Sequence, residues 1–351
     1  MTQPLEPMAA TATPSPADPT EPGPAQTTES GPAKTAKPGP AQADDRARAY
    51  RAAAQITREQ LRRDAPEKAR VLDAVEKSDV VVVRGCYDRV EDVLGALEVE
   101  FTACEPSTLD RLALRPEQLL VINCPGQVSA HAITRIRAFV ETGGSLFTTD
   151  WALKHVIEPT FPGVLAFNER PTADDVVRIE VKDPDNIYLQ GVIDGQDDPL
   201  WWLEGSSYPI RVVDPERVQV LITSKELGQK YGEEPVAVWF RWGEGEVFHM
   251  ISHYYLQRTE LRTARHQASA ASYFSEKRVR MTRAMRAEFD GLALSDVESA
   301  KPSTAFMSNV VIDKKERALR LRAQRAEAAR RQAEEEAARL LAERGKGDGV
   351  S

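Results

Sequence analysis

Hydrophobic residues form short continuous runs in the middle of the chain, between about residues 78 and 278. Residues 79–83 hold four consecutive valines, and 119–123 read LLVIN. Continuous apolar runs of this length predict strands buried on both faces, as in a parallel sheet covered by helices. Segments typical of helices follow at 88–97 and 129–142, with further strands expected at 99–102 and 145–149. This alternation predicts an α/β fold with a doubly wound, mostly parallel sheet of the flavodoxin-like type.

The pattern changes after residue 160. Residues 160–215 are rich in Pro, Asp and Gly, with a half-exposed strand expected at 176–181, and we interpret them as an insertion in the 78–278 domain. A buried strand pattern returns at 218–223. Two apolar strands, 235–241 and 246–252, flank Gly243-Glu244-Gly245, which predicts an antiparallel hairpin.

The two ends of the chain have a different composition. Residues 1–45 hold ten of the 23 prolines and no Arg, which predicts a disordered tail. Residues 46–77 are rich in helix formers, and Pro66 predicts two helices instead of one. Residues 279–311 are interpreted as a linker. Residues 312–345, dense in Arg, Glu and Ala, predict a charged helix, either a single solvated helix or a coiled coil.

Charge and composition narrow the function classes. With 46 Lys+Arg against 54 Asp+Glu, the net charge of −8 argues against nucleic acid or a membrane surface as partner. No apolar run approaches a membrane span, and no secretory signal is recognised. Three scattered cysteines fit a reducing cytosol, and high Ala and Arg usage suggests a bacterial source. We therefore expect a cytoplasmic protein whose tail or C-terminal helix binds a protein partner; the oligomeric state stays open.

Candidate chemistry is expected where the parallel strands end, because ligands bind at the carboxyl edge of open α/β sheets. Four segments occupy such positions: 84–88, 123–127, 149–151 and 253–255. If the topology is as predicted, these segments converge on one edge of the sheet.

Three stretches carry a resemblance to a known fold family: 119–126 (LLVINCPG), the strand that follows Gly143-Gly144, and the late strand at 243–247 that leads to His253. Together they resemble the class I glutamine amidotransferase-like fold, closest to its trehalose-utilisation-like and non-enzymatic branches. The resemblance covers about residues 78–275. It implies a flavodoxin-like sandwich with its functional site at the carboxyl end of the sheet.

The active members of that family place a cysteine on a tight elbow between a strand and a helix. In this sequence the matching position holds Asp150, and a carboxylate is a poor substitute for the thiolate that amide hydrolysis needs. His253 matches the family's histidine by position, with Glu260 as a distant orienting acid. The departure at Asp150 argues against amidotransferase activity.

Catalytic candidates are accordingly weak, and they comprise Asp150, His253 and Cys124. The ligand-binding candidates are Cys86, Asn123, Gly126, Asp150, Trp151, His253 and Tyr254. Each also has a structural interpretation: Cys124 as a small buried residue before a turn, Asn123 and Asp150 as turn or helix caps, and Trp151 as packing. One His and one Asp fall short of a three-ligand zinc site, so we expect no metal and no cofactor.

Three functions remain open. We favour a non-catalytic amidotransferase-like module that binds a protein partner or a small ligand. The first alternative is an atypical hydrolase or transferase that uses Asp150 and His253. The second is a scaffold protein that assembles through its charged C-terminal helix.

Overall fold

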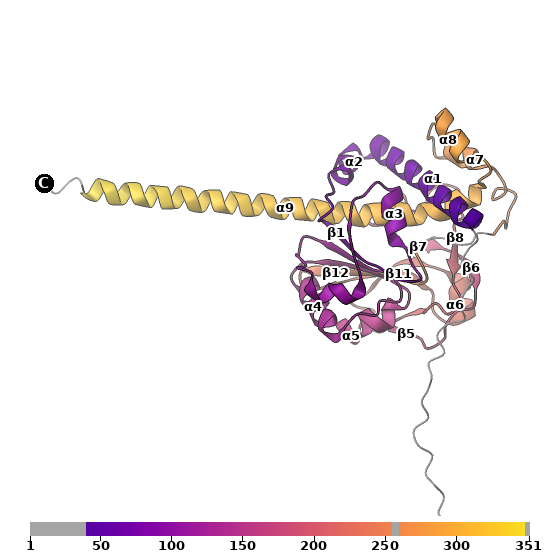
Figure 1. The fold of residues 1–351 in the computed structure, drawn as a ribbon, viewed down its shortest axis with the longest axis horizontal. Coiled ribbons are helices and arrows are strands. Elements are labelled where there is room, and N and C mark those ends of the chain that lie inside the picture. Colours follow the sequence, from indigo (N-terminus) through magenta and orange to yellow (C-terminus); the bar gives the residue numbers. More distant parts are fainter. Residues whose placement is uncertain (1–39, 255–259, 348–351) are drawn as a thin grey trace, which may run out of the picture. The chain divides into compact units, whose positions relative to one another are not determined.

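The computed structural model describes residues 40–254 and 260–347, with side chains over 44–254 and 260–337. Its centre is an eight-stranded sheet in the order β2-β1-β3-β4-β12-β11-β10-β7 (Figure 1). The strands, in that order, are β2 (Thr102–Cys104), β1 (Val80–Val83), β3 (Leu119–Ile122), β4 (Ser145–Thr149), β12 (Gly245–Met250), β11 (Pro235–Trp242), β10 (Gln219–Thr223) and β7 (Glu180–Val181).

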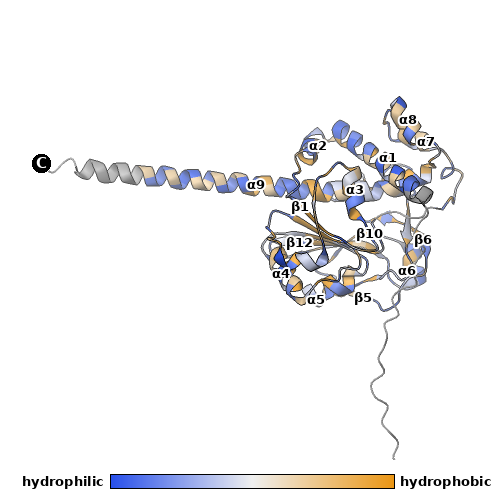
Figure 2. Cartoon of the chain, viewed as in Figure 1, coloured by the Kyte–Doolittle hydropathy of each residue, from blue (hydrophilic) through white to orange (hydrophobic). Residues whose placement is uncertain are grey.

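Most of this sheet is parallel. The pairings β1–β2, β1–β3, β3–β4 and β4–β12 are parallel, whereas β11 runs antiparallel to both β12 and β10. The valine run of β1 and the apolar run of β3 are buried at every position, as continuous apolar patterns predict. Hydrophobic residues follow these central strands in Figure 2. The predicted α/β class and the predicted hairpin of β11 and β12 are therefore confirmed.

Helices cover both faces of the sheet (Figure 1). On one side lie α1 (Pro40–Asp64), α3 (Val90–Ala96) and α9 (Leu294–Gly347); on the other lie α4 (Ala130–Glu141) and α5 (Glu158–Thr160). The remaining helical elements are α2 (Pro66–Asp73), η1 (Pro106–Arg111), η2 (Leu153–Ile157), α6 (Lys225–Tyr231), α7 (Ala270–Glu276) and α8 (Arg283–Glu288). Pro66 opens α2 and so separates it from α1, as expected.

Two sequence boundaries need correction. The strand expected at 99–102 begins later, at Thr102, because residues 97–99 close helix α3: Glu98 has a left-handed φ of 54°, and the Val99 N–H donates to the Leu94 carbonyl at 2.9 Å. The tail predicted over 1–45 lies mostly outside the described residues, and residues 40–45 belong to α1.

The segment expected as an insertion, 160–215, supplies the edge strand β7 of the main sheet and forms two small antiparallel sheets beside it. One pairs β5 (Leu165–Phe167) with β9 (Ile210–Val212), and the other pairs β6 (Asp175–Arg178) with β8 (Leu200–Leu203). All four residues of β8, including Trp201 and Trp202, are buried. The insertion therefore shares the core of the sheet.

The expectation of a linker over 279–311 was wrong. This range holds α8 and the first part of α9, and every residue from 297 to 312 is buried. Its sequence looked like a linker because Pro302, Lys301 and several serines interrupt the apolar pattern. These polar groups find partners: Lys301 donates to the Gly191 carbonyl at 2.6 Å and pairs with Asp194 at 3.0 Å. Because residues 297–312 are buried on every side of the helix, their packing maintains α9 even though Pro302 lies inside it.

Basic residues of α9 also contact the amino ends of the parallel strands. The contacts are Lys314 with the carbonyls of Pro116 and Gly143, both at 2.7 Å, Lys315 with Asp79 at 2.6 Å, and Arg317 with Glu246 at 2.5 Å. These partners precede or begin β3, β4, β1 and β12, respectively. Helix α9 thus joins four strands at the edge opposite the predicted site. From Leu319 to residue 337 its side chains are exposed.

We expect Phe306→Ala to lower the free energy of unfolding by about 3–5 kcal/mol, the usual cost of emptying an aromatic core position. Phe306 is 1% exposed, with its ring 6.1 Å from that of Phe147 and 6.0 Å from that of Phe248. On the same helix, the 42%-exposed Leu319 supplies the control, since Leu319→Ala should change stability by less than about 0.5 kcal/mol. Denaturant unfolding measures both. Equal effects would show that residues 297–312 are not core.

Candidate functional site

The four predicted strand-end segments meet at one edge of the sheet. The backbone N–H of Cys124 donates to the hydroxyl of Thr149 at 3.1 Å, and that of Tyr254 donates to the Asp88 carboxylate at 3.2 Å. Gly85 passes so close to Cys124 that a Cβ on it would lie 2.1 Å from the Cys124 carbonyl oxygen. The topology therefore brings these loops together, as predicted from the order of strands and helices.

Asp150 stands on the elbow after β4. It has a left-handed φ of 45°, a strained conformation for a residue other than glycine. Its Oδ1 accepts the N–H of Tyr208 at 2.8 Å, and its Oδ2 accepts the hydroxyl of Ser207 at 3.3 Å. Burial raises the pKa of the Asp150 carboxyl to about 6, against the lowering effects of His253 and of the Tyr208 hydrogen bond.

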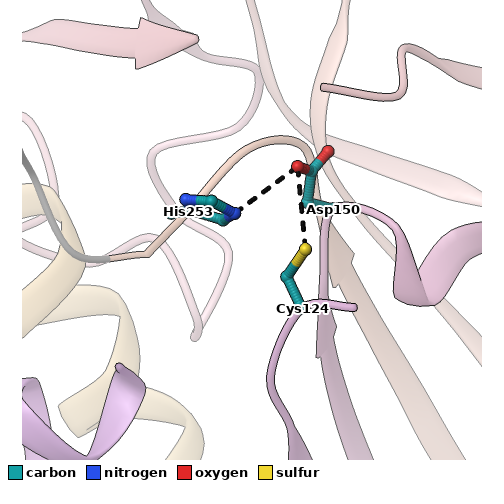
Figure 3. A group of neighbouring side chains, drawn as sticks. All are labelled: Cys124, Asp150 and His253. Atoms are coloured by element: carbon teal, nitrogen blue, oxygen red, sulfur yellow. Dashed lines mark hydrogen bonds and ion pairs between the residues drawn. The ribbon is translucent and has the colours of Figure 1, made fainter. Parts of the chain in front are cut away.

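His253 lies between two carboxylates. Its Nε2 is 3.6 Å from Asp150 Oδ2, and its Nδ1 forms an ion pair with Glu204 Oε2 (Figure 3 draws the Asp150 side). The preceding residue, Ser252, has a left-handed φ of 61° and turns the chain out of the last strand. Burial alone would lower the pKa of His253, but the bond with Glu204 and the charges of Asp88 and Asp150 raise it to about 9.

The thiol of Cys124 lies beside Asp150 and His253, but it is not activated as a nucleophile. Its Sγ is 4.0 Å from Asp150 Oδ2, and the residue is only 1% exposed (Figure 3). Burial, reinforced by the charge of Asp150, holds the pKa of the Cys124 thiol well above its usual value. At neutral pH the sulfur therefore carries its proton, which makes it a poor nucleophile.

Three of the ligand-binding candidates make contacts within the protein. Asn123 accepts the Val90 N–H at 3.2 Å and so supports the start of α3. Gly126 has a φ of 72°, and a Cβ on it would clash with Ala152 at 2.7 Å. The hydroxyl of Tyr254 donates to the Ser303 carbonyl at 2.6 Å, so this side chain points into the α9 core.

Aromatic residues border the cluster of Cys124, Asp150 and His253. The Tyr87 ring stacks on His253 at 6.4 Å between centroids and lies 5.7 Å from Trp151. Trp151 in turn stacks on Tyr208 at 5.3 Å and donates its indole N–H to the Ser206 carbonyl at 2.7 Å. Tyr87 is 40% exposed and Cys86 is exposed, so this rim faces solvent while the acids below it do not.

Sequence reasoning missed Glu204 and Asp88. Glu204 follows the buried run of β8 within the insertion, and its pairing with His253 spans about fifty residues of chain. The available signal was an acid placed directly after an apolar strand, the same signal that selected Asp150. Glu260, the orienting acid considered from the sequence, pairs with Arg262 at 3.0 Å.

Among residues 40–254 and 260–347, no helix combines the length and the apolar character required to cross a bilayer.

Comparison with known proteins gives similarity to solved structures alone. No protein-family model and no curated protein matches the chain. A cytoplasmic protein from Salmonella typhimurium matches at 12% identity and a TM-score of 0.37, over 51% of this chain and 89% of its own. A protein described as a GMP synthase component, from Thermoplasma acidophilum, matches at 12% and 0.36, over 50% and 83%.

A protein described as ThuA-like, from Bacteroides uniformis, matches at 10% identity and a TM-score of 0.35, over 49% of this chain and 79% of its own. The chain also matches parts of β-galactosidases and a β-mannosidase, of which it covers 27–32%. At these identities and TM-scores, none of the similarities assigns an activity or a ligand to this chain.

We expect iodoacetamide to modify Cys86 in the folded protein and to spare Cys124. Burial raises the pKa of both thiols, but Cys86 is exposed, whereas Cys124 is buried and its pKa is raised well above its usual value, so alkylation of Cys124 should be slower by about two orders of magnitude. Peptide mass spectrometry measures both rates, and denatured protein, in which all three cysteines react, is the control. Equally rapid labelling of Cys124 would instead reveal an accessible thiolate and restore a nucleophilic role.

Proposed function

We propose that this chain is a non-catalytic amidotransferase-like module whose strand-end site binds a small ligand. The observation that carries the proposal is the elbow after β4, which presents a buried carboxylate, while the neighbouring thiol of Cys124 is held in its protonated form. Thiol-based amide hydrolysis requires the opposite arrangement, an activated thiolate on the elbow.

The chemistry of the site indicates what kind of ligand it takes. Asp88, Asp150 and Glu204 surround a single imidazole, so acids outnumber bases in the buried group. Above them lies the aromatic rim of Tyr87 and Trp151. An acidic interior beneath an exposed Tyr87 ring and a half-buried Trp151 ring suits a ligand with a cationic or hydrogen-bond-donating group.

The proposal predicts that the protein releases no ammonia from glutamine and that a compound with an amine or amidine group raises its melting temperature. At a ligand concentration of 100 times Kd, the stabilisation should be about 2.7 kcal/mol. A thermal-shift panel of amines, amidines, nucleosides and sugars provides the measurement. Tyr87→Ala should abolish the shift, whereas Ile187→Ala, at a similarly exposed position, should keep it. Glutamine turnover that is lost in Cys124→Ser would disprove the proposal.

A second function, hydrolysis through Asp150, has one specific observation in its favour. The side chains of Glu204, His253 and Asp150 contact one another in series, in the order of an orienting acid, a base and a nucleophile. The raised pKa of His253 weighs against it, because a protonated imidazole cannot accept a proton at neutral pH. We therefore rank it below the binding module.

An ester-hydrolysis assay with p-nitrophenyl acetate separates the two functions. If Asp150 is catalytic, Asp150→Asn and His253→Gln should each lower the rate by at least about 100-fold. The matched control is His131→Gln, at an exposed position on α4. If wild type and the three variants hydrolyse the ester at equal rates, hydrolysis through Asp150 is excluded and the binding function stands.

A further inference from the structure

Three potential metal ligands of different chemistry converge at the strand-end site. Cys124 follows β3, Asp150 follows β4 and His253 follows β12, so each comes from a separate loop. Their Sγ, carboxylate oxygen and imidazole nitrogen all lie within 4.8 Å of one another. Across 44–254 and 260–337, where side chains are described, this is the one group of three or more His, Cys, Asp or Glu residues with such spacing. The sequence alone offered one His and one Asp for a metal; the fold brings the thiol of Cys124 beside them as a third donor.

The distances are close to those of a tetrahedral metal site. Zinc bonds of about 2.0–2.3 Å to N, O and S place neighbouring ligand atoms about 3.3–3.7 Å apart. Here Asp150 Oδ2 is 3.6 Å from His253 Nε2 and 4.0 Å from Cys124 Sγ. Figure 3 shows the three side chains pointing toward a common point. Contraction by a few tenths of an ångström along these two edges, together with closure of the third edge, between Cys124 and His253, from within 4.8 Å, would bring the three atoms to metal-ligand spacing.

The orientation of His253 provides an independent observation. A histidine that binds a metal usually donates its other ring N–H to a carboxylate, which fixes the tautomer and the ring plane. Glu204 occupies that position on Nδ1. Nε2, on the opposite side of the ring, faces Asp150 Oδ2 at 3.6 Å, beyond hydrogen-bond distance, although His253 is only 5% exposed. The nitrogen left for a ligand is therefore the one that faces the other two donors.

We infer that Cys124, Asp150 and His253 bind one divalent transition-metal ion of the zinc type, with Glu204 as the residue that positions His253. Sulfur and imidazole ligands favour zinc and its neighbours over magnesium or calcium, which prefer oxygen. On binding, the sulfur forms a bond to the metal and releases its proton to solvent, as does the imidazole when it is protonated. Three protein ligands leave a fourth position for a further ligand.

This inference rests on the proposed ligand-binding role of the strand-end site and specifies what the site binds. The contacts among Asp150, His253 and Glu204 also suit a purely structural ion-pair network. Metal binding is the property that distinguishes the two.

The test uses the full chain, purified with a chelator and then titrated with Co²⁺ and Zn²⁺. We expect one ion per chain and a thiolate-to-cobalt charge-transfer band in the near ultraviolet. Cys124→Ser should abolish the band and weaken zinc binding at least about 100-fold, since the thiolate ligand is lost. Glu204→Gln should keep the band and weaken zinc binding about 10–100-fold, because it changes only the orientation of His253.

Matched control variants distinguish the loss of a metal ligand from a general loss of folding. Cys104→Ser and His131→Gln remove the same residue types outside the group and should bind both metals as wild type does. Circular dichroism of each variant verifies its fold. The inference is overturned if wild type shows no saturable binding of either ion, or if Cys124→Ser retains the cobalt band.

The same samples separate this inference from the proposed function. If chelated wild type binds no metal but is stabilised by an amine in a Tyr87-dependent way, the metal site is wrong and the binding module stands. If neither metal nor amine binds, both are wrong.

Discussion

Charge compensation at the carboxyl edge of the sheet constrains the rest of this structure. Removing an ion from water costs several kcal/mol unless a partner of opposite charge or a set of hydrogen bonds replaces the solvent. Asp150, Glu204 and His253 are all buried, and each is compensated by the others or by backbone N–H groups such as that of Tyr208. The insertion supplies Glu204, Ser207 and Tyr208, while the sheet supplies Asp150 and His253. Separating these two parts would leave uncompensated charge, so the insertion is an integral part of the site.

The elbow after β4 shows that the fold and the chemistry of this site depend on different residues. Its backbone adopts a left-handed conformation, with a φ of 45°, and the residue there is an aspartate. The nearby sulfur, Cys124, comes from a different strand and from a buried position. The order of strands and helices depends on apolar patterns, whereas a reaction depends on single side chains, so the fold alone does not assign the chemistry of this site.

Features that depend on neighbouring residues in the sequence were predicted correctly, whereas those that depend on distant residues were missed. The valines of β1 and the apolar run of β3 predicted their strands because both faces of each are buried, and the strand order then placed Cys124, Asp150 and His253 together. Glu204 was missed because its partner lies far along the chain and no local pattern marks it. Residues 297–312 were misassigned for a related reason: Lys301 and Pro302 look solvent-exposed until Gly191 and Asp194 are seen to cover them.

The continuity of α9 has a mechanical consequence. One helix carries Phe306 in the core, Lys315 on the start of β1, and exposed residues from Leu319 onward. Because the helix is continuous, its exposed residues are joined without a break to Lys314, Lys315 and Arg317, which contact the amino ends of four strands. The orientation of the exposed part of α9 is therefore fixed at its base by the sheet and not by a flexible joint.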